Sequence, residues 1–203
     1  MTTEVKPSSR PYILIALVWL ALACAIGATG RMAQLRPPLP QVVILALTAA
    51  LIWAGVKHRG FHDWLEQVSL RGVVAFHLTR FVGFAFLATY ARNELPFEFA
   101  VPAGWGDIIV AVGALAIVLF QPRPESRPPV LMLWNVVGFA DIVGAVLSAA
   151  RLALRDASSM APLLEFPMSL VPTFIVPIVV ASHVLVFWRI SRPATALPVT
   201  QGA

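Results

Sequence analysis

Five ionisable residues lie inside long apolar stretches of this sequence: His77, Arg80, Asp107, Asp141 and His183. An ionisable side chain at membrane depth is costly unless it is paired or faces a wet cavity, and such groups commonly form substrate sites or proton pathways. Asn135 is a polar companion on the same stretch as Asp141. The pattern predicts that six residues bind a small solute or a proton: His77, Arg80, Asp107, Asn135, Asp141 and His183.

Helical spacing arranges most of these side chains in two stripes. Steps of three residues place His77, Arg80 and Gly83 on one helix face. A second stripe of polar and small residues runs through Asn135, Gly138, Asp141, Ala145 and Ser148. Small residues let membrane helices approach closely, and polar residues then form hydrogen bonds between them. We therefore expect the two stripes to face each other or a shared cavity.

Arg80 needs a counter-ion if it lies within the membrane. A rise of about 1.5 Å per residue places Arg80 and Asp141 within roughly 5 Å of the bilayer midplane, with Asp107 slightly to the outer side. Because a guanidinium does not lose its proton in proteins, we expect Asp141, Asp107 or both to neutralise Arg80. Such an ion pair is either a structural clamp between helices or a site that binds a substrate or a proton.

The two histidines support a different hypothesis, a haem b electron-transfer protein. His77 and His183 are expected at similar depth, roughly 7 Å to the cytoplasmic side of the centre. Two histidines at equal depth on different helices are the minimum for bis-histidine ligation of haem iron, and Gly83 and Gly138 would leave room for a porphyrin edge. No cofactor is otherwise predicted.

The composition identifies the environment that positions these residues. Of the 203 residues, 59% are hydrophobic and 12% are charged, and the mean hydropathy is +0.81. Soluble domains are about 45–50% apolar and about 25% charged, so a soluble fold is excluded. The fold class is therefore predicted to be an all-α integral membrane protein, a single domain over residues 1–203.

Six stretches are long and apolar enough to cross a bilayer as helices. They cover approximately residues 12–29, 39–56, 73–91, 101–120, 130–152 and 167–190. The first has an apolar core of about 18 residues, longer than that of a signal peptide, so we expect it to remain as a span. The intramembrane ionisable residues all fall in spans three to six, so spans one and two are expected to pack around that unit or to hold a partner.

Three segments are expected to depart from plain spans. Phe61–Leu70 has apolar residues at helical spacing and predicts a short amphipathic helix at the membrane interface. Pro96–Asp107 contains two prolines and two glycines, so it is not expected to form one regular helix, and Asp107 is placed near the start of a helix. Span six carries Pro167, Pro172 and Pro177, which should kink or break it.

The distribution of Lys and Arg predicts the topology. With both termini in the cytoplasm, the inner segments hold nine of these residues and the outer segments five. Positively charged loops favour the cytoplasmic side, so we expect a multi-pass protein of a bacterial-type inner membrane with cytoplasmic N- and C-termini. The bilayer is its main partner, and a homo-oligomer or a larger membrane complex, in which the chain is a non-catalytic subunit, is a further hypothesis.

Several other functions lack their sequence signals. The net charge is +5, but the basic residues are scattered between apolar stretches, so no nucleic-acid partner is predicted. The single cysteine, Cys24, provides neither an internal disulfide nor a cysteine-based metal site. Phosphate-binding loops, dinucleotide fingerprints, zinc-protease motifs and nucleophile elbows do not occur. The sequence thus favours a transporter-like function over an enzyme.

Overall fold

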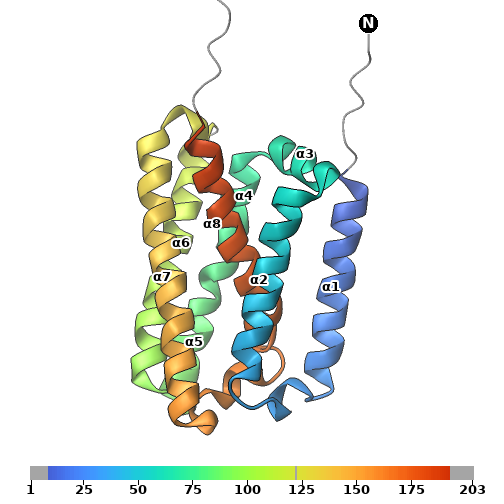
Figure 1. Ribbon diagram of the computed structural model, residues 1–203. Coiled ribbons are helices and arrows are strands. Elements are labelled where there is room, and N and C mark those ends of the chain that lie inside the picture. The colour runs from blue at the N-terminus through green and yellow to red at the C-terminus, as the bar shows by residue number, and fades with distance from the viewer. Residues whose placement is uncertain (1–8, 122, 193–203) are drawn as a thin grey trace, which may run out of the picture.

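The computed structural model describes residues 9–121 and 123–192, and every regular element in these residues is a helix. Six long helices stand side by side in a bundle (Figure 1). They are α1 (Arg10–Ala28), α2 (Leu39–Lys57), α4 with η2 and α5 (Leu70–Ala91), α6 (Phe97–Phe120), α7 (Pro128–Arg155), and η5 with α8 (Val171–Ile190). The prediction of six helices able to cross a membrane is confirmed.

The outer faces of the bundle are apolar. Large hydrophobic side chains are exposed on α1, α2, α6 and α7; Trp53 of α2 and Phe120 of α6, for example, are 66% and 80% exposed. A contiguous apolar surface of this kind is not stable in water and is suited to lipid. The first residue of α1 and the last residue of α8 lie at the same end of the bundle (Figure 1).

A short helix, α3 (Arg59–Gln67), joins α2 to α4 and lies across this end of the bundle (Figure 1). The helix predicted over Phe61–Leu70 is therefore present but shifted, because the His58 side chain accepts a hydrogen bond from the Phe61 N–H and caps an earlier start. On one side of α3, Phe61 and Trp64 contact the ring of Tyr12 in α1. We call the end of the bundle that α3 crosses the α3 end.

Glu66 links α3 to Arg192, two residues after the end of α8. Its Oε1 accepts a hydrogen bond from Arg192 Nη1 at 2.5 Å, and the Arg192 guanidinium also lies 3.6 Å from the centre of the Trp188 ring. The hydrogen bond from Arg192 holds the pKa of Glu66 below its usual value. This contact stabilises the fold above the ordinary pKa of a glutamate and is lost as Glu66 takes up its proton.

The expected break before Asp107 is wrong, because α6 is one helix from Phe97 to Phe120 with Pro102 inside it. Pro102 has no N–H to donate to the carbonyl of Glu98, one turn earlier. The Ser148 hydroxyl of α7 donates to that carbonyl instead, at 3.2 Å. A neighbouring helix thus replaces the missing hydrogen bond, and Asp107 lies well inside α6 rather than near its start.

The predicted irregularity of span six is present, although its helical part starts at Val171 rather than Pro167. Residues Val171–Ile175 form a π-helical turn, η5, and α8 (Val176–Ile190) follows. Pro177 cannot donate to the carbonyl of Thr173, and the indole N–H of Trp19 in α1 donates to it at 3.0 Å. An unsatisfied buried carbonyl costs about 1–3 kcal/mol, so this contact is one reason why α1 packs against the kink.

Two apolar clusters fill the inside of the bundle. One lies toward the α3 end and includes Leu70, Val74 and Leu131. The other lies toward the opposite end, where the 3₁₀ helix η4 (Ala157–Leu164) follows α7, and includes Phe86 and Phe99. We call that the η4 end. The intramembrane ionisable residues lie between these two clusters.

Candidate functional site

A change of helix type in the third span positions two of the predicted residues. The α-helical α4 (Leu70–Phe76) tightens into a 3₁₀ helix, η2 (His77–Val82), before α5 (Gly83–Ala91) resumes the α-helix. In a 3₁₀ helix, residues three apart lie directly above one another. His77 and Arg80, the first and fourth residues of η2, therefore share one face, and both are buried, with 0% and 1% exposure.

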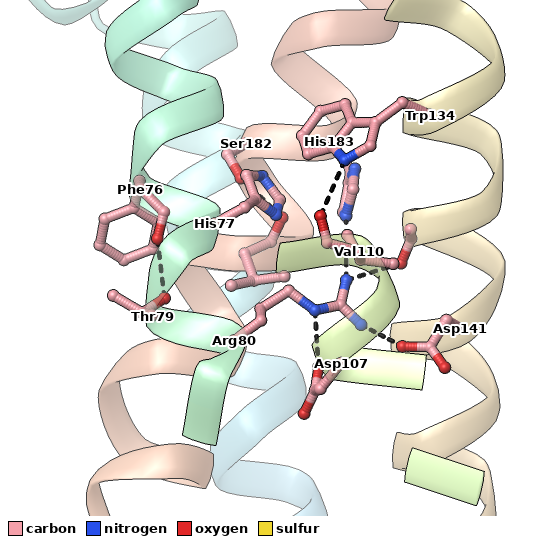
Figure 2. Close-up of polar contacts among 12 residues, drawn as sticks. Phe76, His77, Thr79, Arg80, Asp107, Val110, Trp134, Asp141, Ser182 and His183 are labelled. Atoms are coloured by element: carbon pink, nitrogen blue, oxygen red, sulfur yellow. Dashed lines mark hydrogen bonds and ion pairs between the residues drawn. The ribbon is translucent and has the colours of Figure 1, made fainter. Parts of the chain in front are cut away.

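Arg80 lies between the two aspartates, as Figure 2 shows. Its Nε donates to Asp107 Oδ1 at 2.6 Å, and its Nη2 donates to Asp141 Oδ2. Its Nη1 donates to the carbonyl oxygen of Gly138 at 2.9 Å. All three guanidinium nitrogens thus have protein oxygens as acceptors. Of the three alternatives expected from the sequence, the structure has the one in which both aspartates pair with Arg80. We call Arg80, Asp107 and Asp141 the charged triad.

The triad has an unbalanced charge. One guanidinium and two ionised carboxylates sum to −1, and the Asp107 residue is only 5% exposed, whereas the Asp141 side chain is 20% exposed. A net charge held away from water is unfavourable. One bound proton would bring the charge of the triad to zero.

His183 and Asn135 continue the polar network toward the α3 end. His183 Nδ1 lies 2.8 Å from Asn135 Oδ1, and Asn135 Nδ2 donates to the His183 carbonyl at 3.1 Å. Because the amide oxygen of Asn135 accepts, the proton of His183 is assigned to Nδ1. Its Nε2 lone pair then faces Arg80, whose Nη1 is 3.4 Å away.

His77 packs against the ring of His183 and completes the cluster. Its Nε2 lies 3.0 Å from the Ser182 hydroxyl, and its Nδ1 is buried with no hydrogen-bond partner among the described residues. Its ring centre is 4.4 Å from that of His183 and 4.8 Å from that of Trp134. The six residues predicted from the sequence are thus brought together.

The histidine geometry bears on the haem hypothesis. The two imidazole rings are in direct contact, and ligation of one iron between them would require the helices that carry them to move apart. The space expected beside the glycines is filled: a Cβ on Gly138 would lie 2.6 Å from His183 Cε1, and one on Gly83 would overlap the carbonyl oxygen of Gly104. Haem binding stays a prediction that an absorbance spectrum of the purified protein tests.

Two glycines allow the helices to approach closely enough to form the triad. Gly138 has no side chain to displace His183, so its carbonyl reaches Arg80. Gly106 in α6 faces Asp141 in α7, and a Cβ there would overlap the Asp141 carboxylate. Both positions fit the general use of small residues at the interfaces of membrane helices.

Sequence reasoning missed three of the residues that build this site. Ser182 contacts His77 and is a polar residue inside a span, but the search for ionisable side chains passed over it because serine is not ionisable. Trp134 packs against both histidines while its indole N–H donates to the Val110 carbonyl at 3.0 Å. Gly106 was noted only as a helix breaker, and its role depends on the partner helix, which the sequence does not reveal.

A cavity adjoins the triad on the side of the η4 end. Its volume is about 100 Å³, and its wall includes Arg80 and Asp107 at one place and otherwise mostly apolar side chains from α2, α5, α6, α7, η4 and the start of α8. Alanines on α7, such as Ala149 and Ala153, contribute to this space. Arg80 and Asp107 of the charged triad therefore border a largely apolar cavity.

Comparison with known proteins identifies one family. No curated protein and no solved structure matches the chain. The model of a family described as a domain of unknown function (DUF8737) matches residues 37–191. The match covers about three quarters of the chain, including η2, α6, α7 and α8 with all six site residues, and it leaves out α1. The chain thus belongs to the DUF8737 family.

Proposed function

We propose that this protein binds a proton at the charged triad and uses it to move a proton or a small solute through the polar region among spans three to six. The observation that carries the proposal is the burial of Arg80 between two carboxylates on different helices. Arg80 keeps its charge, so it holds the two carboxylates together while one proton comes and goes.

The surroundings of the triad support this function rather than a static clamp alone. Toward the α3 end, Leu70, Val74, Leu131 and their apolar neighbours form a cluster, whereas toward the η4 end the triad borders a cavity. A site with a cavity on one side and packed side chains on the other is compatible with alternating access.

The helix geometry around the triad supplies places where the structure can change. The 3₁₀ helix η2 carries Arg80, and the π-turn η5 directly precedes α8, which carries His183. Mid-helix 3₁₀ segments and π-turns often occur at functional hinges. A shift in either element would alter the contacts of Arg80 and His183 together.

The proposed setting is a bacterial-type inner membrane with both termini in the cytoplasm. The bias of Lys and Arg toward one set of connectors supports this orientation. In that orientation the α3 end faces the cytoplasm, and the cavity lies in the outer half of the bundle. We propose a role in binding and transport rather than enzymatic catalysis.

Proton flux into liposomes tests the proposal. The full chain is reconstituted around a pH-sensitive dye, a pH gradient is imposed, and the rate of the internal pH change is recorded. We expect Asp107→Asn and Asp141→Asn to slow the protein-dependent flux by at least about tenfold, because the triad is then neutral without a proton. Glu98→Gln, which changes an exposed carboxylate in the first turn of the same helix as Asp107, should leave the flux unchanged. Equal flux in all four proteins would contradict the proposal.

A further inference from the structure

The cavity beside the triad has a chemistry that selects among ligands. Its walls are mostly apolar, and the polar side chains among them are Arg80, Asp107 and Gln41. A ligand of this cavity must therefore place carbon atoms against most of the wall and a polar group at one of these few positions.

Two oxygens at these positions can accept a hydrogen bond from a ligand, one on Asp107 and one on Gln41. The three guanidinium nitrogens of Arg80 already donate to Asp107, Asp141 and Gly138. Asp107 uses Oδ1 for Arg80, and Figure 2 shows its second carboxylate oxygen directed away from the guanidinium. The amide oxygen of Gln41 is buried and has no hydrogen-bond partner among the residues that the structure describes. A ligand that donates hydrogen bonds can therefore pair with oxygens that the protein leaves open.

The net charge of the triad restricts the class of ligand further. With both carboxylates ionised the triad carries −1, so it attracts a cation and repels an anion. A carboxylate or phosphate ligand would find the arginine already paired and would meet Asp107 instead. A protonated amine, in contrast, has donors only and would make the site neutral, as a bound proton does.

Size sets the last limit. An apolar protein cavity of about 150 Å³ holds the six carbon atoms of benzene, so a cavity of about 100 Å³ accommodates a molecule of about four to five non-hydrogen atoms. A four-carbon chain with one ammonium group lies at the upper end of this range.

We propose that the cavity binds a small alkylammonium ion, with its ammonium group on the free oxygen of Asp107 and its carbon chain against the alanines of α7. The ligand and the proton then compete for the same carboxylate, and the protein exchanges one for the other. This inference rests on the proposed function, for which it names the substrate class.

Ligand-observed NMR with the purified full chain in detergent micelles tests the proposal. The probes are 1-butylammonium, 1-butanol and butyrate, which share a chain length and differ in the charge of the polar group. We expect saturable binding of butylammonium, weakened as the pH falls because protons compete, and clearly weaker binding of butanol and butyrate. Equal binding of butanol and butylammonium, or no binding of butylammonium, would overturn the inference.

Three variants locate the bound ligand. Asp107→Asn removes the carboxylate, and Ala149→Leu places three more carbon atoms in the cavity wall; each should weaken butylammonium binding by at least about tenfold. Ala140→Leu, an exposed position on the same helix, should bind as the wild type does. Unchanged binding in Asp107→Asn would overturn the inference. Loss of proton flux in the aspartate variants, with no butylammonium binding to the wild type, would leave the proposed function standing and the inference overturned.

Discussion

Replacing Arg80 with glutamine should lower the free energy of unfolding by about 3–5 kcal/mol. The substitution leaves Asp107 and Asp141 facing each other between α6 and α7 without a cation, and a buried carboxylate without its partner is strongly destabilising. Thermal or denaturant-induced unfolding of the purified protein in detergent micelles measures the loss.

Arg92 provides the matched control. It forms an ion pair with Glu94, but the side chains of both are about half exposed, 57% and 46%. Water screens an exposed pair of this kind, so it contributes little to stability, and Arg92→Gln should change the stability little. An Arg80→Gln protein as stable as Arg92→Gln would show that Arg80 is not a buried, paired cation.

The aspartates should show strongly non-additive effects on stability. Asp107→Asn or Asp141→Asn alone leaves one carboxylate opposite Arg80, so the triad is neutral, and each amide oxygen still accepts from the guanidinium; we expect losses within about 1 kcal/mol. The double variant leaves an unpaired guanidinium inside the bundle and should lose about 3–5 kcal/mol. The same unfolding measurement, arranged as a double-mutant cycle, gives the coupling.

A triple variant checks that charge causes the coupling. Adding Arg80→Gln to the double aspartate variant removes the unpaired cation, so at least about 2 kcal/mol of stability should return. If the losses of the two single variants simply add, or if the triple variant is less stable than the double, the three residues do not share one charge balance.

The residues of the site could be predicted from the sequence because an ionisable side chain in an apolar span is costly unless it is paired or faces water. The residues that meet this condition only by pairing with one another or by contacting water are His77, Arg80, Asp107, Asp141 and His183. The same rule fixed the number of long helices, because each must contain about 20 apolar residues.

Pairings within the site could not be derived in this way. Asn135 seemed a companion of Asp141 but bonds to His183. Asn135 and Asp141 are six residues apart on α7, which is about 9 Å along the helix axis. They therefore contact partners at different depths. Those depths depend on how far each helix is shifted along its neighbours, which helical spacing alone does not determine.

The effect of individual prolines was hard to predict for a related reason. Pro102 was expected to interrupt a helix, yet α6 runs through it because Ser148 satisfies the carbonyl that the proline leaves free. Likewise, Trp19 satisfies the carbonyl freed by Pro177. Both partners are distant in the sequence, so the local consequence of each proline depends on tertiary contacts.

Infrared difference spectroscopy of the purified protein tests the central claim most directly, which is that the charged triad binds one proton. Spectra recorded at low and high pH reveal the C=O band of a protonated carboxyl group inside the protein, and exchange into heavy water identifies it. We predict one such band in the wild type and in Glu98→Gln, and its loss in both Asp107→Asn and Asp141→Asn. A band that persists unchanged in both aspartate variants, or a wild-type protein without one over the whole pH range in which it stays folded, would contradict the account.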